Sequence, residues 1–74
     1  MRNTETIDWR EVGKLVRQLR GFNLAQAEVA RRIGVSQSYL SAVELGKGEI
    51  GAQVLLSMSR EFGKSIEWLL TGKP

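Results

Sequence analysis

The chain has 74 residues, of which 42% are hydrophobic and 26% are charged, with a formal net charge of +3. This length fits one small domain, which buries only about 60% of the surface that its unfolded chain exposes. The absence of cysteine and histidine excludes disulfides, Cys/His zinc sites and imidazole acid–base chemistry. Because no apolar run approaches the roughly 18 residues of a membrane helix and the first residues lack the apolar stretch of a signal peptide, we expect a soluble cytoplasmic protein.

The positive charge is spread along the chain, with five basic and three acidic residues in 1–25, three of each in 26–50, and three basic and two acidic in 51–74. A basic balance is compatible with nucleic-acid binding. Without a run of Lys or Arg, the charge favours DNA only slightly over an acidic protein partner.

Hydrophobic spacing and glycine positions predict five short helices and no strand. The first helix lies between Asp8, which fits an N-cap with Glu11 as its capping-box partner, and Gly21, which ends it. Its apolar residues recur at i, i+3, i+4 and i+7 on one face: Val12, Leu15, Val16 and Leu19.

The second helix is expected over residues 26–33 and the third over about 36–45. Gly34 ends the second helix, Ser36 caps the third and Gly46 ends it. Val35 and Leu40 have the spacing of a hydrophobic staple at the start of the third helix.

The fourth helix is expected over residues 52–62, and the fifth between Ser65 as N-cap and Gly72 as terminator. Apolar residues mark the inner faces of these two helices: Leu55, Met58 and Phe62 on the fourth, and Ile66, Leu69 and Leu70 on the fifth.

Only Gly34 and Val35 separate the second and third helices, so these helices must cross steeply. A steep crossing requires a small residue at the contact, which Ala30 supplies, and a turn residue that tolerates positive φ, which Gly34 supplies. The apolar seam that the two helices share is then Val29, Ile33, Leu40 and Val43.

The segment Gln26-Ala-Glu-Val-Ala-Arg-Arg-Ile-Gly-Val-Ser-Gln-Ser-Tyr-Leu-Ser-Ala-Val-Glu44 resembles the helix-turn-helix of the Cro/phage-repressor (XRE-like) family. The resemblance extends to Leu19-Arg20 at the end of the first helix and to Leu69-Leu70-Thr71-Gly72 at the end of the last. It therefore covers about residues 9–72.

The resemblance implies an all-α, compact five-helix lambda-repressor-like domain over residues 1–74, with an ordered core of about 8–72. It also implies that the helix over 36–45 docks in the major groove, where its first residues reach base edges. Gln37 is the best candidate for base reading, because glutamine can bond adenine N6 and N7 bidentately. Ser38 and Ser41 are open between bases, phosphates and water, and Ala42 between a thymine methyl and a simple filler.

Four further residues complete the expected DNA-binding set. Gln26 matches the family position that contacts phosphate and buttresses the first glutamine of the recognition helix, and Ser36 starts that helix. Lys47 is either a phosphate contact or a solvated lysine, and the Tyr39 hydroxyl either meets phosphate or covers the domain surface. By contrast, Arg31 and Arg32 are expected on a solvated face that contributes only long-range attraction.

Other matching positions are expected to be structural. Arg20 and Glu44 resemble a family ion pair between the first and third helices, whose loss costs about 3–5 kcal/mol if buried or about 0–1 kcal/mol if exposed. The structural set is Arg20, Ala30, Gly34, Leu40, Val43 and Glu44.

The sequence departs from the family pattern at three places. Ala25 stands where a capping Ser, Thr or Asn is usual, which forfeits about 1 kcal/mol and leaves Glu28 as half a capping box. Ile50-Gly51 replaces the common Pro-Ser/Thr before the fourth helix, and Lys64 replaces an apolar residue.

Two short motifs resemble nucleotide-binding loops without their context. Gly46-Lys-Gly-Glu-Ile-Gly51 matches G-x-G-x-x-G, but a dinucleotide site needs a strand before that motif and a βαβ unit around it. Gly63-Lys64-Ser65 resembles the end of a P-loop, but Met58 occupies the position of the first glycine. We therefore expect turn glycines and no cofactor, metal or small-molecule ligand.

The expected function is a sequence-specific transcriptional regulator of prokaryotic or phage type, most simply a dimeric repressor on a palindromic operator, located with the nucleoid. The alternative is a protein-interaction module, such as an antitoxin or a coactivator-like adaptor, that binds DNA only with a partner. No nucleophile–base constellation indicates an enzyme. Trp68, off the apolar face of the fifth helix, is a candidate for the homodimer interface. Trp68 and Trp9 can equally close the core beside the first helix.

Overall fold

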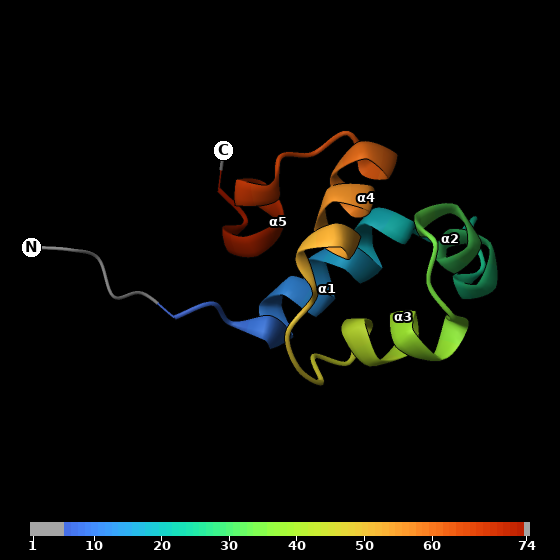
Figure 1. The fold of residues 1–74 in the computed structure, drawn as a ribbon, viewed down its shortest axis with the longest axis horizontal. Coiled ribbons are helices and arrows are strands. Elements are labelled where there is room, and N and C mark those ends of the chain that lie inside the picture. Colours follow the sequence, from blue (N-terminus) through green and yellow to red (C-terminus); the bar gives the residue numbers. More distant parts are fainter. Residues whose placement is uncertain (1–5, 74) are drawn as a thin grey trace, which may run out of the picture.

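Five α-helices joined by short loops make up residues 6–73, the range that this computed structural model describes (Figure 1). In chain order they are α1 (Trp9–Arg20), α2 (Gln26–Ile33), α3 (Gln37–Glu44), α4 (Ala52–Phe62) and α5 (Ile66–Thr71). The predicted all-α class is therefore confirmed. No helix in the described range is long and apolar enough to cross a membrane.

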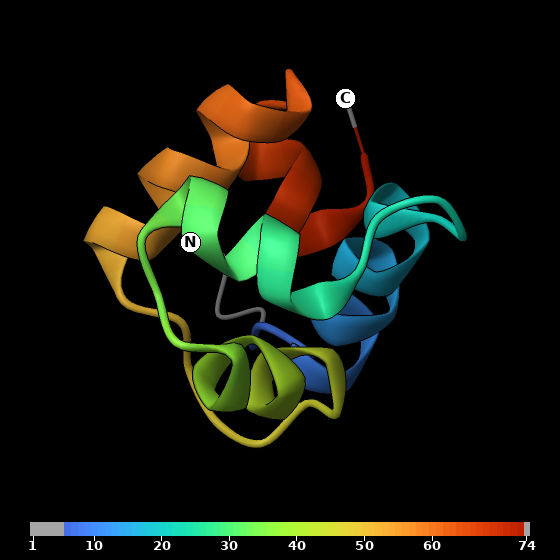
Figure 2. The same cartoon turned by 90° about the vertical axis from the view of Figure 1, so that its right-hand side faces the viewer.

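The packing of the helices leaves one side of α3 open. α1 packs against α3 and α5, α2 against α3 and α4, and α4 against α5. In Figure 1, α3 and α5 lie on opposite sides of α1, and in Figure 2 α3 is the lowest helix, with the loop to α4 running below it. Because its neighbours cover only its inner side, α3 presents its outer side to solvent.

All five helices contribute to the core, mainly through the apolar faces that the sequence predicts. The predicted seam between α2 and α3 is confirmed, since its four residues are buried. The buried hydrophobic residues are Val12, Val16, Val29, Ala30, Ile33, Leu40, Val43, Ile50, Leu55, Met58 and Leu69.

The turn between α2 and α3 has the expected chemistry. Gly34 adopts a left-handed conformation with φ 80° and ψ 30°, which glycine adopts without steric cost. Ala30 is buried, and its carbonyl accepts a 2.9 Å hydrogen bond from the Val35 amide. The chain therefore changes direction within two residues, and α3 packs against α2.

The backbones of α1 and α3 approach each other unusually closely. A β-carbon at Gly13, in the middle of α1, would overlap the carbonyl oxygen of Val43 and lie 2.9 Å from that of Glu44. Gly46 follows α3 with φ 73°, and a β-carbon there would lie 2.7 Å from the Arg10 α-carbon. The two helices thus pack at a distance that only glycine permits, which the periodicity of the first helix did not indicate.

Three of the helix N-termini are capped by side chains as predicted. The Asp8 carboxylate accepts from the amides of Arg10 and Glu11, Ser36 accepts from Tyr39, and Ser65 accepts from Trp68. The prediction that Glu11 and Glu28 act in capping boxes is wrong, because each carboxylate pairs with basic side chains about one turn later instead. These pairs are Glu11 with Lys14, and Glu28 with Arg31 and Arg32.

Ala25, the N-cap of α2, makes no side-chain hydrogen bond, as predicted. We expect Ala25→Ser to raise the free energy of unfolding by about 1 kcal/mol, because its hydroxyl can accept from a free amide of the first turn. Urea denaturation followed by circular dichroism measures this change. Ala27→Ser is the matched control, since the same substitution inside the helix offers no cap and costs a few tenths of a kcal/mol in propensity, roughly.

Of the expectations near the ends of α3 and α5, one is confirmed and one needs correction. The end of α3 is as predicted: after Glu44 and the C-cap Leu45, Gly46 ends the helix with φ 73°, its amide bonds the Val43 carbonyl, and the Lys47 amide bonds the Ala42 carbonyl. On α5, Ile66 is exposed rather than inward.

The predicted loop glycines are confirmed within the described range. Gly46 and Gly48 have φ values of 73° and 109° in the loop between α3 and α4. The G-x-G-x-x-G segment therefore follows a helix and contributes two turns, rather than the strand–turn–helix of a dinucleotide site.

Candidate nucleic-acid interface

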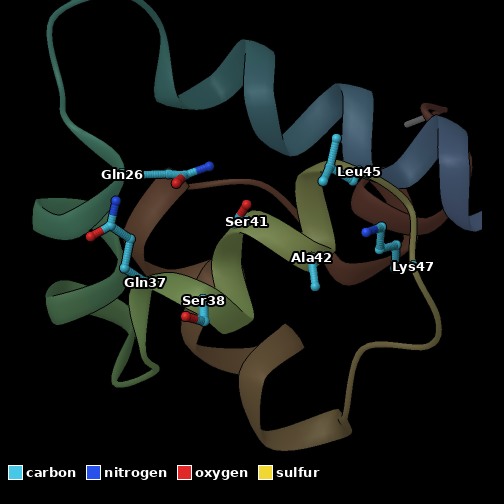
Figure 3. A pocket seen from close by; sticks show the side chains of 7 residues that line it. All are labelled: Gln26, Gln37, Ser38, Ser41, Ala42, Leu45 and Lys47. Carbon is cyan, nitrogen blue, oxygen red and sulfur yellow. The ribbon is translucent and has the colours of Figure 1, made fainter.

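An open hollow of about 370 Å³ lies along the outer side of α3 (Figure 3). We name it the α3 groove. The structure brings six of the eight predicted DNA-binding residues to it, together with one residue that was not predicted. The lining residues are Gln26, Gln37, Ser38, Ser41, Ala42, Leu45 and Lys47.

The two sides of α3 carry different residue types. Leu40 and Val43 face inward and are buried, while Gln37 and Ser38 are exposed on the first turn. In Figure 3 the amide and hydroxyl groups gather towards the N-terminal end of α3, and Leu45 and Lys47 lie towards the other end. The groove thus offers hydrogen-bonding groups at one end and an apolar surface beside a cation at the other.

Ser36 and Tyr39 do not line the groove. The Ser36 hydroxyl oxygen accepts from the Tyr39 amide at 3.0 Å, so it serves the cap of α3. The Tyr39 side chain is half-buried, and its hydroxyl oxygen accepts from the Gly51 amide at 3.4 Å. Tyr39 therefore ties α3 to the start of α4.

Glu44 is the centre of a hydrogen-bond network behind the groove. Arg20 binds its carboxylate with two parallel contacts, Nε to Oε2 at 2.7 Å and Nη2 to Oε1 at 2.9 Å. The side chains of Arg20 and Glu44 are only 13% and 6% exposed, which settles the open question in favour of a largely buried pair. Arg20 also donates to the Leu24 carbonyl at 2.9 Å, so it fixes the loop that leads to α2.

The same carboxylate holds Gln26, one of the groove residues. Gln26 Nε2 donates to Glu44 Oε1 at 3.0 Å. The resemblance implied that Gln26 buttresses Gln37, whereas here its amide nitrogen bonds Glu44. Because a carboxylate only accepts hydrogen bonds, Glu44 fixes which end of the Gln26 amide is nitrogen.

Two opposing effects set the pKa of Glu44. Burial raises it, but the hydrogen bonds from Arg20 and Gln26 and the nearby positive charge outweigh burial, so the pKa lies below its ordinary value. Glu44 is therefore ionised at neutral pH, and the network behind the groove is fully charged.

A second network covers the exposed side of α2. Hydrogen bonds from Arg31 and Arg32 lower the pKa of Glu28 to about 2. Arg32 also pairs with Glu61 of α4 at 3.2 Å. Arg31 and Arg32 are exposed, as predicted, but both are paired with carboxylates. Among the residues that line the α3 groove, Lys47 is the one that carries a formal charge.

Trp68, the candidate interface residue, is half-buried and packs against the core, and so does Trp9. The Lys64 ammonium lies 4.8 Å from the centre of the Trp68 ring. Trp68 is therefore less exposed than its position off the apolar face of α5 suggested, because α5 packs on both α1 and α4.

Two helices joined by a tight turn, the second with a buried inner side and a polar outer side, define the helix-turn-helix class of DNA-binding domain. A family model described as helix-turn-helix matches residues 14–69, well over half of the chain. The chain therefore belongs to the helix-turn-helix family of the Cro/phage-repressor (XRE-like) type, and it is a DNA-binding transcriptional regulator.

Similar solved structures agree with this assignment. The P22 c2 repressor protein, solved in complex with synthetic operator 9T in the presence of Tl+, is 28% identical, with a TM-score of 0.78, and the match covers 84% of this chain and 96% of that one. The restriction-modification controller protein C.AhdI from Aeromonas hydrophila is 25% identical, with a TM-score of 0.74 and coverage of 84% and 91%. The clp gene regulator ClgR from C. glutamicum is 28% identical, with a TM-score of 0.73 and coverage of 89% and 87%. The comparison with curated proteins finds no match.

Sequence reasoning missed two features of the interface. Leu45 was not among the predicted residues, although its position off the inward register of Leu40 and Val43 is compatible with the outer side, where it lines the groove. The bond from Gln26 to Glu44 joins residues 18 apart in sequence, and no local pattern indicates it.

Proposed function

We propose that this regulator is a repressor that binds a palindromic double-stranded operator as a homodimer, with α3 in the major groove. The observation that carries the proposal is the α3 groove itself, in which exposed hydrogen-bonding side chains stand on one helix above a buried apolar face. One domain offers one recognition helix, and specific binding by this class usually needs two, on half-sites about 34 Å apart. The proposal assigns no catalytic step to the chain.

In this proposal the DNA-binding residues divide by role. Gln37 reads a base, with Ser38, Ser41 and Ala42 beside it on base edges or on the backbone. Phosphate contacts fall to Lys47, Gln26, Ser36 and Tyr39. The last three lie at the starts of α2 and α3, where free backbone amides and the helix dipole favour anions. Trp68 of α5 is the proposed centre of the dimer contact.

Selection of bound sequences from a random duplex library at about physiological salt tests the proposal. A repressor of this kind enriches a palindrome whose half-site centres are about one helical turn apart, and sedimentation of the complex gives two chains per duplex. Salt-sensitive binding without an enriched sequence would contradict it. That result would instead favour a module that needs a partner protein to choose its DNA.

Gln37→Ala is expected to lower affinity for the selected operator by about 1–3 kcal/mol and to relax discrimination at one base position. The loss arises because a bidentate contact to one base disappears. Affinities for the operator and for its single-base variants measure the effect. An equal loss for every sequence would show that Gln37 does not read a base.

Lys47→Ala provides the contrasting result, because an ammonium contact to phosphate carries no sequence information. We expect weaker binding to all sequences alike and a decrease of about one in the slope of log affinity against log salt. Titrations at several salt concentrations measure the slope. An unchanged slope would place Lys47 in solvent.

A further inference from the structure

We propose that Leu45 reads the methyl group of thymine and is a second base-discriminating residue of this protein. This inference rests on the proposed function, because it requires α3 to enter the major groove.

Leu45 stands out among the apolar side chains of the described range. It is 63% exposed, although most leucines of the chain are buried or half-buried. The other large hydrophobic residues that are exposed, Phe22 and Ile66, do not line the α3 groove, whereas Leu45 does. When a ligand covers an exposed apolar side chain on a recognition surface, the removal of apolar area from water favours binding.

The neighbours of Leu45 indicate which ligand fits. Ala42, three residues earlier, lines the same groove, and Lys47 lies with Leu45 towards its C-terminal end. Leu45 has no group that bonds phosphate or a polar base edge. The C5-methyl of thymine is the one apolar group that a base pair presents in the major groove.

The backbone at Leu45 is fixed before any ligand binds. Its amide donates to the Ser41 carbonyl at 3.1 Å. On one side Arg20 anchors Glu44, and on the other Gly46 packs tightly against the Arg10 backbone. The side chain therefore projects from a rigid position, as required of a group that distinguishes bases by one methyl.

Replacing each thymine of the selected operator by deoxyuridine, one symmetric pair at a time, removes the methyl and nothing else. We expect one pair at which affinity falls about fourfold for each methyl, the ratio that burial of one such group gives. In Leu45→Ala the ratio of thymine to deoxyuridine affinity at that pair should fall to about one, while the salt slope stays unchanged because no charge is removed.

Phe22→Ala is the matched control, because Phe22 is 98% exposed and lies outside the groove. It should keep the full thymine-to-deoxyuridine ratio, and thermal melting should show that both variants fold. Persistence of the ratio in Leu45→Ala, or an operator with no methyl-sensitive thymine, would overturn the inference and leave the proposed function intact. A library without an enriched sequence would overturn both.

Discussion

Gly13→Ala is expected to lower the free energy of unfolding by about 3 kcal/mol or more, the upper end of overpacking effects. Helix propensity alone favours the alanine by about 1 kcal/mol. The clash outweighs this gain because the new methyl meets the backbone carbonyls of Val43 and Glu44, and no side-chain rotation can relieve it. α1 and α3 would have to move apart.

Urea denaturation of Gly13→Ala and of the unchanged protein measures the loss. Gly51→Ala is the control, because a β-carbon there has nothing within 4 Å and its φ is −65°. The control is expected to change stability by less than about 1 kcal/mol, the cost of an N-cap change. Equal stability of Gly13→Ala and the unchanged protein would mean that α1 and α3 do not pack as closely as described.

Glu44→Ala is expected to cost about 3–5 kcal/mol, because it leaves the largely buried Arg20 guanidinium without its partner. The same change frees the Gln26 amide, so specific DNA binding should weaken beyond what the folded fraction explains. Denaturation and operator titration at a temperature where the variant is folded measure the two effects.

The double variant Arg20→Met, Glu44→Leu separates charge from packing. Replacing both partners by apolar side chains removes the unpaired charge, so the double variant should be more stable than Glu44→Ala. A double variant as unstable as Glu44→Ala would show that the ion pair is not what these residues contribute.

The lowered pKa of Glu44 also gives the pair a pH dependence with a definite sign. A carboxyl whose pKa is lower in the folded than in the unfolded state stabilises the fold above its unfolded pKa, with loss as the pH falls through the folded value. The ordinary value is 4.5, so stability from Glu44 should decline in acid below that value. Glu44→Gln should show a smaller decline between neutral pH and about pH 3.

The helices and their shared core were predictable because they depend on local signals. Hydrophobic spacing and the terminating glycines predicted α2 and α4 at their observed bounds. The two-residue connection, with Ala30 and Gly34, was enough to predict how α2 and α3 meet. Gln26, Gln37 and Lys47 were predicted for one surface because the resemblance places them in register, and the structure brings them to one groove.

The remaining features depend on contacts between distant residues. The need for glycine at position 13 comes from carbonyl groups on α3, some 30 positions later, so the sequence shows only a glycine within a helical pattern. The Glu28 side chain is close enough in sequence either to cap α2 or to form ion pairs, and it pairs with Arg31 and Arg32. The half-buried state of Trp68 depends on how α5 packs on α1 and α4.

The division of α3 into a buried side and an outer side bears on how such a regulator diverges. Residues that hold the fold, Leu40 and Val43, are not those that line the groove, apart from the link through Glu44 to Gln26. If these residues read the operator as proposed, a gene duplicate could acquire a new operator through a few exchanges at Gln37, Ser38, Ser41, Ala42 and Leu45 with little loss of stability. The same five positions form a compact library for directed evolution of DNA preference, with Gln26 and Glu44 held constant.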